Sequence, residues 1–162
     1  MDDFTFDVCV IGGCGHVGLP LSLVLAKNGK KVVAYDIAKD AVELVSQGKM
    51  PFIEDGAQEI LTSVNGKNFF ATSDISVVGR SHFVFTVIGT PVDKHMNPSF
   101  DVVESFFRDI VKYLHDGQIL ILRSTVYPGV TEKIYKFLKE NHPKIEICFC
   151  PERIAEGKAI RE

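Results

Sequence analysis

The feature that most constrains the fold of this chain is a run of glycines between an apolar segment and an amphipathic one. Residues 8–18 read VCVIGGCGHVG, and LPLSLVLAKNG follows directly. Glycines at this spacing permit a tight strand-to-helix turn, close approach of a pyrophosphate to the backbone and close packing of the helix on the strand. The start of the helix adds free N–H groups and the positive end of its dipole. The pattern predicts a dinucleotide-binding turn made by Gly13, Cys14, Gly15, His16, Val17 and Gly18.

Strand-like and helix-like segments alternate along the rest of the chain. Apolar runs predict strands at residues 6–12, 30–37, 68–74, 82–91, 118–126 and 144–150. Helical periodicity predicts helices from the glycine turn to about residue 28 and at 39–48, 55–64, 101–115 and 128–142. Apolar strands that alternate with helices indicate a parallel sheet covered on both faces. Right-handed crossovers then favour an α/β fold, a Rossmann-type doubly wound parallel sheet with helices on both faces, over residues 1–162.

Candidate ligand contacts lie where the predicted strands end, because doubly wound sheets bind ligands beyond the carboxyl ends of their strands. Asp36 ends the second strand, where a carboxylate accepts hydrogen bonds from the ribose hydroxyls of NAD and repels the 2′-phosphate of NADP. The sequence therefore predicts NAD as the cofactor. His16 is expected to flank the phosphates rather than to act as a general base. The other strand ends offer Gly89, Thr90, Pro91, Ser124, Thr125 and the segment after Cys150.

The overall charge and the cysteine pattern exclude several classes of function. The net charge of −3 gives no reason to expect nucleic acid or an anionic membrane as a partner. The longest apolar runs fall short of the roughly 20 residues that a membrane span needs, and MDDFTFD lacks the charge pattern of a signal peptide. We therefore expect a cytoplasmic protein. The four cysteines show no metal-ligand spacing, so we expect no metal site and buried, reduced thiols.

Three further motifs lie at strand ends, and they carry a family resemblance. They are VIGTP at 87–91, RSTVYPGVT at 123–131 and CPERIAEGKAIRE at 150–162. In this order after the glycine turn, they resemble the N-terminal half of the nucleotide-sugar 6-dehydrogenases, which include UDP-glucose, GDP-mannose and UDP-N-acetylhexosamine dehydrogenases. The resemblance covers essentially the whole chain, including PFIEDGAQEIL at 51–61 and NPSFDVVES at 97–105.

The resemblance implies an NAD-dependent, four-electron oxidation of a sugar C6 alcohol to a carboxylate. Glu152 matches the acid of a Pro-Glu motif, a general acid/base near the substrate. Such a group suits the reaction, because hydride loss from an alcohol must be accompanied by proton removal. Glu156 matches a second carboxylate near the cofactor. The implied cofactor contacts are Gly13, Gly15, Gly18, Asp36, Thr90 and Thr125. Ala41 departs from the family, which often has Arg or Lys there on the adenosine side.

The residue after the Pro-Glu motif bears on the substrate. Members that act on N-acetylhexosamines usually read Pro-Glu-Arg, whereas glucose and mannose members usually read Pro-Glu-Phe. This chain has Arg153 followed by Ile154, and a guanidinium makes several hydrogen bonds to a sugar or diphosphate. The resemblance therefore favours UDP-N-acetylmannosamine or UDP-N-acetylglucosamine as substrate, in an enzyme of polysaccharide biosynthesis that is a homodimer or a higher homo-oligomer.

The family's nucleophilic cysteine belongs to a later domain, so the chain is expected to supply only the cofactor-binding half of the enzyme. Three alternatives stay open. One is a UDP-glucose 6-dehydrogenase, and another is a two-domain hydroxyacid dehydrogenase with the same opening half. The third is a non-catalytic NAD-sensing module, which explains the glycine turn and Asp36 but not the Glu152 and Glu156 pair.

Overall fold

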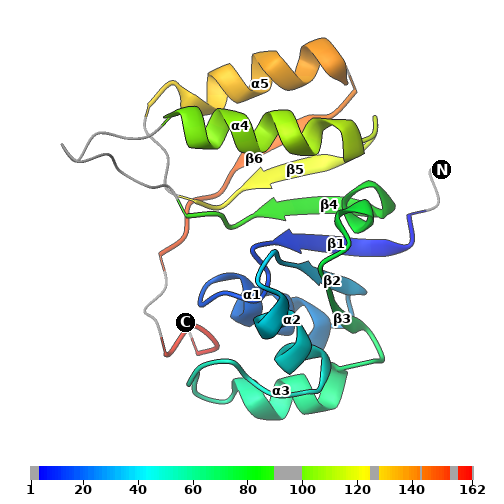
Figure 1. The fold of residues 1–162 in the computed structure, drawn as a ribbon, viewed down its shortest axis with the longest axis vertical. Helices are drawn as coiled ribbons and strands as arrows, with labels where there is room; N and C mark the ends of the chain where they lie inside the picture. The colour runs from blue at the N-terminus through cyan, green and yellow to red at the C-terminus, as the bar shows by residue number, and fades with distance from the viewer. Residues whose placement is uncertain (1–3, 90–99, 125–127, 143, 154–156, 162) are drawn as a thin grey trace.

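A single parallel sheet of six strands forms the centre of the computed structural model (Figure 1). The structure describes residues 4–89, 100–124, 128–142, 144–153 and 157–161. The strand order is β3-β2-β1-β4-β5-β6, in which two halves diverge from the central pair β1 and β4. This order confirms the Rossmann-type fold expected from the sequence. The strands are β1 (Phe6–Ile11), β2 (Val32–Tyr35), β3 (Phe69–Thr72), β4 (Ser81–Thr86), β5 (Ile119–Leu122) and β6 (Glu146–Phe149).

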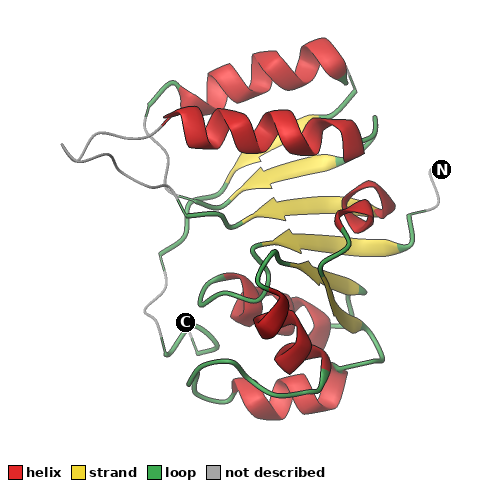
Figure 2. Ribbon diagram, in the orientation of Figure 1, coloured by secondary structure: helices red, strands yellow, loops and turns green. Residues whose placement is uncertain are grey.

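Helices cover both faces of the sheet, as Figure 2 shows. On one side lie α1 (Gly18–Lys27), α2 (Lys39–Ser46) and α3 (Ala57–Val64), and on the other lie α4 (Phe100–Ile110) and α5 (Val130–Asn141). The alternation of side chains along β1 feeds the two cores. Val8 and Val10 pack toward α1, whereas Cys9 and Ile11 pack toward the α4 side. The central strands are therefore buried on both faces, which is why they are continuously apolar.

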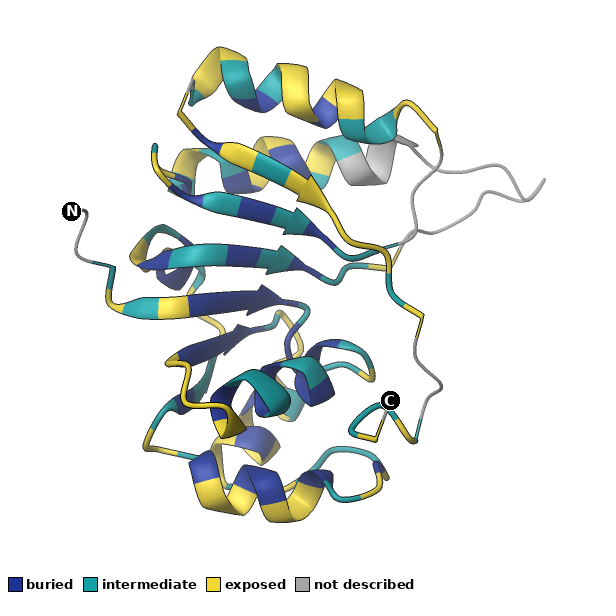
Figure 3. Ribbon diagram, turned by 180° about the vertical axis from the view of Figure 1, so that it is seen from behind, coloured by how far each residue is buried: buried dark blue, intermediate teal, exposed yellow. Residues whose placement is uncertain are grey.

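The edge strand β6 differs from these central strands, as Figure 3 shows. Three of its four residues are exposed, including Cys148 and Phe149, and Cys150 just beyond it is also exposed. The expectation of buried thiols is correct for Cys9 and Cys14 but wrong for Cys148 and Cys150. The alternating CFC pattern is typical of a strand, but it does not reveal that the strand lies at the edge of the sheet.

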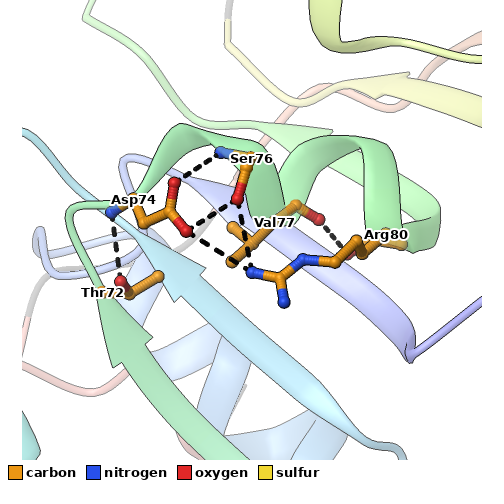
Figure 4. Close-up of polar contacts among 6 residues, drawn as sticks. Thr72, Asp74, Ser76, Val77 and Arg80 are labelled. Atoms are coloured by element: carbon orange, nitrogen blue, oxygen red, sulfur yellow. Dashed lines mark hydrogen bonds and ion pairs between the residues drawn. The ribbon is translucent and has the colours of Figure 1, made fainter.

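Two short 3₁₀ helices were not anticipated from the sequence. The helix predicted for 101–115 ends at Ile110 and gives way to η2 (Val111–Tyr113). The second, η1 (Ile75–Arg80), lies between β3 and β4 and begins at a local polar cluster around Asp74 (Figure 4). The Asp74 carboxylate accepts hydrogen bonds from the backbone N–H of Ser76 at 3.0 Å and from its hydroxyl at 2.6 Å. The hydroxyl bond is the main cause of the lowered pKa of Asp74.

Two features are absent from the part of the chain that the structure describes. None of the helices found there combines the length and the apolar character that crossing a membrane requires. The same residues hold no group of three or more His, Cys, Asp or Glu side chains that could bind a metal ion.

A buried glutamine joins the segments that lead into β4 and β5. The Gln118 side chain is fully buried. Its Nε2 donates to the carbonyl oxygens of Val78 at 2.7 Å and Ser81 at 2.5 Å, and its Oε1 accepts from the His115 N–H at 2.6 Å. Three backbone groups from the η1–β4 and η2–β5 junctions therefore depend on one side chain.

We expect Gln118→Leu to lower the free energy of unfolding by about 2–4 kcal/mol, because buried backbone groups lose their partners while the volume is kept. Urea unfolding of both proteins measures this difference. Gln47→Leu is the matched control, because Gln47 is exposed at the end of α2. A loss for Gln118→Leu no larger than that of the control would contradict the role given to this amide.

Candidate active site

The glycine turn after β1 is held close to its neighbours by contacts that leave no room for side chains. A Cβ on Gly13 would lie 2.7 Å from the Ala34 Cβ in β2, and one on Gly18 would lie 2.9 Å from the Gly13 Cα. The sharp backbone turn itself falls on Gly12, whose φ of 78° is in the left-handed region. The glycine spacing predicted this turn at Gly13, so the prediction is wrong by one residue. Gly12 thus makes the turn and also lies against the end of β4, since a Cβ there would clash with the Val87 carbonyl oxygen, whereas Gly13 packs on β2.

Asp36 lies at the end of β2, directly beside the glycine turn. Its Oδ2 accepts a hydrogen bond from the Cys14 N–H at 3.0 Å, and its Oδ1 accepts one from the Ala38 N–H at 3.0 Å. Each carboxylate oxygen accepts two or more hydrogen bonds, so both can still receive a ribose hydroxyl. Asp36 thus lies at the end of β2, as the sequence predicts, and it also helps to fix the turn, while its contact with a ribose stays a prediction. Ala41, which stands where the family often has Arg or Lys, is half-buried in α2.

The amide groups at the start of α1 are available to a ligand. Within the described part of the chain, the backbone N–H groups of His16, Val17 and Gly18 have no hydrogen-bond acceptor. All three residues line a cavity of about 310 Å³. The opposite wall is formed by Val87, Ile88 and Gly89 after β4 and by Arg123 and Ser124 after β5. Free N–H groups at a helix start form a site for phosphate, and Gly15 leaves the approach open because no side chain covers it.

Two side chains in the turn have environments that limit their chemistry. His16 is exposed, and its ring stacks on the Phe52 ring with 4.0 Å between the centroids. It flanks the turn, as expected. Cys14 is buried, and burial, with a further contribution from the Asp36 carboxylate, raises the pKa of its thiol to about 12. A thiol of this kind stays protonated at neutral pH, so Cys14 is a poor nucleophile.

The structure describes only some of the site residues predicted at the other strand ends. Gly89 and Ser124 line the 310 Å³ cavity, and the Ser124 hydroxyl donates to the Ile88 carbonyl at 2.5 Å, which ties the ends of β4 and β5 together. Arg153 is exposed next to Glu152. The other predicted site residues lie outside the described part of the chain; they are Thr90, Pro91, Thr125, Ile154 and Glu156.

Glu152 forms an ion pair with Arg123, a residue that the sequence analysis did not single out. Their side chains are only 15% and 17% exposed, respectively. The Glu152 N–H also donates to the Arg123 carbonyl at 3.0 Å, so the backbone keeps the two residues in register. The Arg123 Nη1 lies 3.4 Å from the Cys150 Sγ. Arg123 could have been found from the sequence, because it directly follows the apolar run ILIL and strand ends carry ligand-binding groups in this fold.

A second cavity, of about 360 Å³, is also lined by both residues of this ion pair. The start of α1 lines it with Val17, Pro20 and Leu21, and the segment after β6 lines it with Pro151, Glu152 and Arg153. Both cavities are lined by Val17, Arg123 and Glu152. Glu152 therefore lies at the boundary between a cavity suited to phosphates and a neighbouring cavity lined by Arg153.

Comparison with known proteins gives a consistent assignment. Residues 6–162 match the UDP-glucose/GDP-mannose dehydrogenase family, NAD binding domain. The chain is 31% identical to a UDP-N-acetyl-D-mannosamine dehydrogenase of Methanococcus aeolicus, with 96% of this chain and 36% of the relative covered. It is 29% identical to the enzyme of that name from Campylobacter jejuni, with 96% and 40% covered.

A solved structure supports the fold. The chain superposes on a GDP-mannose dehydrogenase from Pseudomonas aeruginosa with a TM-score of 0.86 at 23% identity, covering 96% of this chain and 38% of that one. The chain thus spans about two-fifths of the length of the proteins it matches. By the family match over nearly all of its residues, the chain belongs to the UDP-glucose/GDP-mannose dehydrogenase family, of which it is an NAD-binding domain.

Proposed function

We propose that this chain supplies the cofactor-binding half of a dehydrogenase that oxidises the C6 alcohol of a UDP-N-acetylhexosamine, either UDP-N-acetylmannosamine or UDP-N-acetylglucosamine. The observation that carries the proposal is Glu152 at the boundary of two cavities. The relatives from Methanococcus aeolicus and Campylobacter jejuni bear the name of the first activity. In the active enzyme, the domain is the first part of a longer polypeptide that assembles as a homodimer or a higher homo-oligomer.

The glycine-turn cavity fits a dinucleotide in three respects. The missing side chains let a pyrophosphate reach the backbone, the free N–H groups of His16, Val17 and Gly18 can donate to it, and Asp36 can bind the adenosine ribose. Bound NAD⁺ supplies the hydride acceptor. From the family resemblance, Thr90, Thr125 and Glu156 are proposed as further contacts near it.

The neighbouring cavity is the proposed sugar site. A C6 alcohol that loses hydride toward the cofactor must lose its hydroxyl proton at the same time. Glu152 can accept this proton, directly or through a water molecule, because it lines both cavities. Arg123 fixes the carboxylate by its ion pair, and Arg153 on the sugar side can hydrogen-bond the acetylated sugar or its diphosphate.

The second oxidation needs a nucleophilic thiol, which this chain is not expected to provide. An aldehyde held as a thiohemiacetal can lose a second hydride and leave a thioester for water to hydrolyse. Burial raises the pKa of Cys9 and of Cys14, and the residues lining the two cavities do not include Cys148 or Cys150. The nucleophile is therefore proposed to lie in the later part of the enzyme.

The cofactor preference tests the role of Asp36. We expect the chain to bind NAD⁺ more tightly than NADP⁺, and Asp36→Ala to weaken NAD⁺ binding by about tenfold or more, because hydrogen bonds to a charged acceptor are lost. The same substitution narrows the gap between the two cofactors, since the repulsion of the 2′-phosphate disappears. Calorimetric titration with each dinucleotide measures both effects. Asp40→Ala is the matched control, because Asp40 is an exposed acid in the first turn of α2. Tighter binding of NADP⁺ by the original sequence would contradict this assignment.

Turnover tests the proposed substrate. We expect the 162 residues alone to form no NADH with any nucleotide sugar. Joined to the catalytic half of a UDP-N-acetyl-D-mannosamine dehydrogenase, they should form NADH with a UDP-N-acetylhexosamine, and Arg153→Phe should remove most of this activity. Absorbance of NADH with UDP-N-acetylmannosamine, UDP-N-acetylglucosamine and UDP-glucose gives the result.

Each contrary outcome of this assay has a definite meaning. Turnover of UDP-glucose with no response to either acetylated sugar would favour a UDP-glucose 6-dehydrogenase. Cofactor binding without any turnover in the joined protein would favour the NAD-sensing module. Sustained NADH formation by the 162 residues alone would show that the nucleophile lies within them.

A further inference from the structure

The loop between α2 and α3 contains a buried carboxylate that the proposed chemistry does not use. Glu54 is only 6% exposed. Its Oε2 accepts a hydrogen bond from the Gly157 N–H at 2.9 Å, and its Oε1 accepts one from the Ile160 N–H at 3.4 Å. Among the described residues, no Lys, Arg or His forms an ion pair with it. The partners of this buried charge are therefore backbone amides more than a hundred residues away in the sequence.

Other contacts join the same two segments. The Asp55 N–H donates to the Gly157 carbonyl at 3.2 Å, and Arg161 pairs with the Asp55 carboxylate at 2.8 Å. Ile160 packs against the apolar core on the α1 side. Figure 1 shows the end of the chain beside the loop that precedes α3, on the side of the sheet where the strands end. We call residues 157–161 the C-terminal turn.

The C-terminal turn follows Glu152 and Arg153 closely in the sequence, and Glu152 is anchored separately. The Cys150 and Glu152 N–H groups donate to carbonyls in the strand-end segment of β5, and Glu152 pairs with Arg123. The segment that carries Arg153 is thus fixed on one side by Arg123 and on the other by Glu54. Ala159, in the C-terminal turn, also lines the 360 Å³ cavity together with Glu152 and Arg153.

We propose that Glu54 is a positioning residue, which holds the C-terminal turn and thereby sets the shape of the 360 Å³ cavity around Arg153. This assignment rests on the proposed function, since it concerns the cavity given to the sugar. Undocking of the turn would leave Glu54 without its hydrogen-bond partners. Because a buried carboxylate without hydrogen bonds is costly, this loss opposes undocking. An apolar residue in the loop would fill the same space without this penalty. The acid therefore ties the loop to one arrangement of the distant turn.

The loop also contacts the cofactor side of the site. Phe52, two residues before Glu54, stacks on His16 of the glycine turn. The loop therefore contacts the glycine turn through an aromatic pair and the C-terminal turn through a carboxylate. Only the second contact is predicted to control the sugar cavity, so cofactor binding and sugar turnover should respond differently to substitution of Glu54.

Glu54→Gln tests this directly, because the amide keeps the volume and one acceptor but opposes an N–H donor with its own NH₂ group. In the 162-residue chain, we expect trypsin to cleave after the exposed Lys158 about tenfold faster or more, because opening of the turn becomes easier. Mass spectrometry identifies the cut. Glu59→Gln is the matched control, since Glu59 is exposed on α3. The NAD⁺ affinity should stay within about twofold for both variants.

In the protein joined to a catalytic half, Glu54→Gln should lower kcat with the nucleotide sugar by about tenfold or more, because the sugar is held less well for reaction. The KM for NAD⁺ should stay unchanged, a split that general loss of folding would not produce. Equal rates of cleavage after Lys158 in Glu54→Gln and the original sequence would overturn the proposal, as would parallel losses of kcat and NAD⁺ affinity. Failure of the original chain to bind NAD⁺ would instead overturn the proposed function, while the cleavage rates would still decide whether Glu54 holds the turn.

Discussion

The structure depends on the close contact of three backbone segments at the end of β1. Gly12 and Gly13 both donate N–H groups to the Tyr35 carbonyl of β2, and Gly18 starts α1 against the same turn. This contact exists only because these residues lack a Cβ, and it brings the first N–H groups of α1 to the carboxyl ends of the strands. The proposed dinucleotide cavity follows from it, since the amides then face the strand ends across one space and Asp36 lies beside the turn.

The ion pair of Arg123 and Glu152 connects this cavity to the 360 Å³ cavity, because both residues line both cavities. A dinucleotide-binding fold alone does not determine a reaction, because many functions use the same sheet. What distinguishes this chain is an acidic residue, Glu152, that lines two cavities and pairs with an arginine from the adjacent strand end. Glu54 adds a second anchor, from the opposite half of the sheet, to the segment that carries Glu152. The proposed sugar cavity is therefore assembled from residues far apart in the sequence.

The features that could be predicted from the sequence are those determined by residues close together in the chain. Apolar runs and glycine spacing placed the strands and the turn, and Asp36 follows because it ends a strand beside that turn. Arg123 and Glu54 could not be predicted in the same way, because their roles depend on pairing with residues 29 and 103 positions away or more. The exposure of Cys148 depends on strand order. The tight turn was assigned to Gly13 instead of Gly12 because either of two adjacent glycines satisfies the pattern. Long-range contacts, rather than element types, limited the prediction.

The most direct test of the central account is to observe which amides respond to the cofactor. In two-dimensional NMR spectra of the ¹⁵N-labelled chain, titration with NAD⁺ should shift the amides of His16, Val17 and Gly18 most, because their N–H groups acquire phosphate acceptors. The amides of Gly29 and Gly66, in turns remote from this cavity, serve as internal controls and should not move. Saturable shifts confined to the glycine turn and the Asp36 region would support the account. Absence of saturable shifts, or shifts centred on the α4–α5 cavity around Phe107 and Ile134, would contradict it.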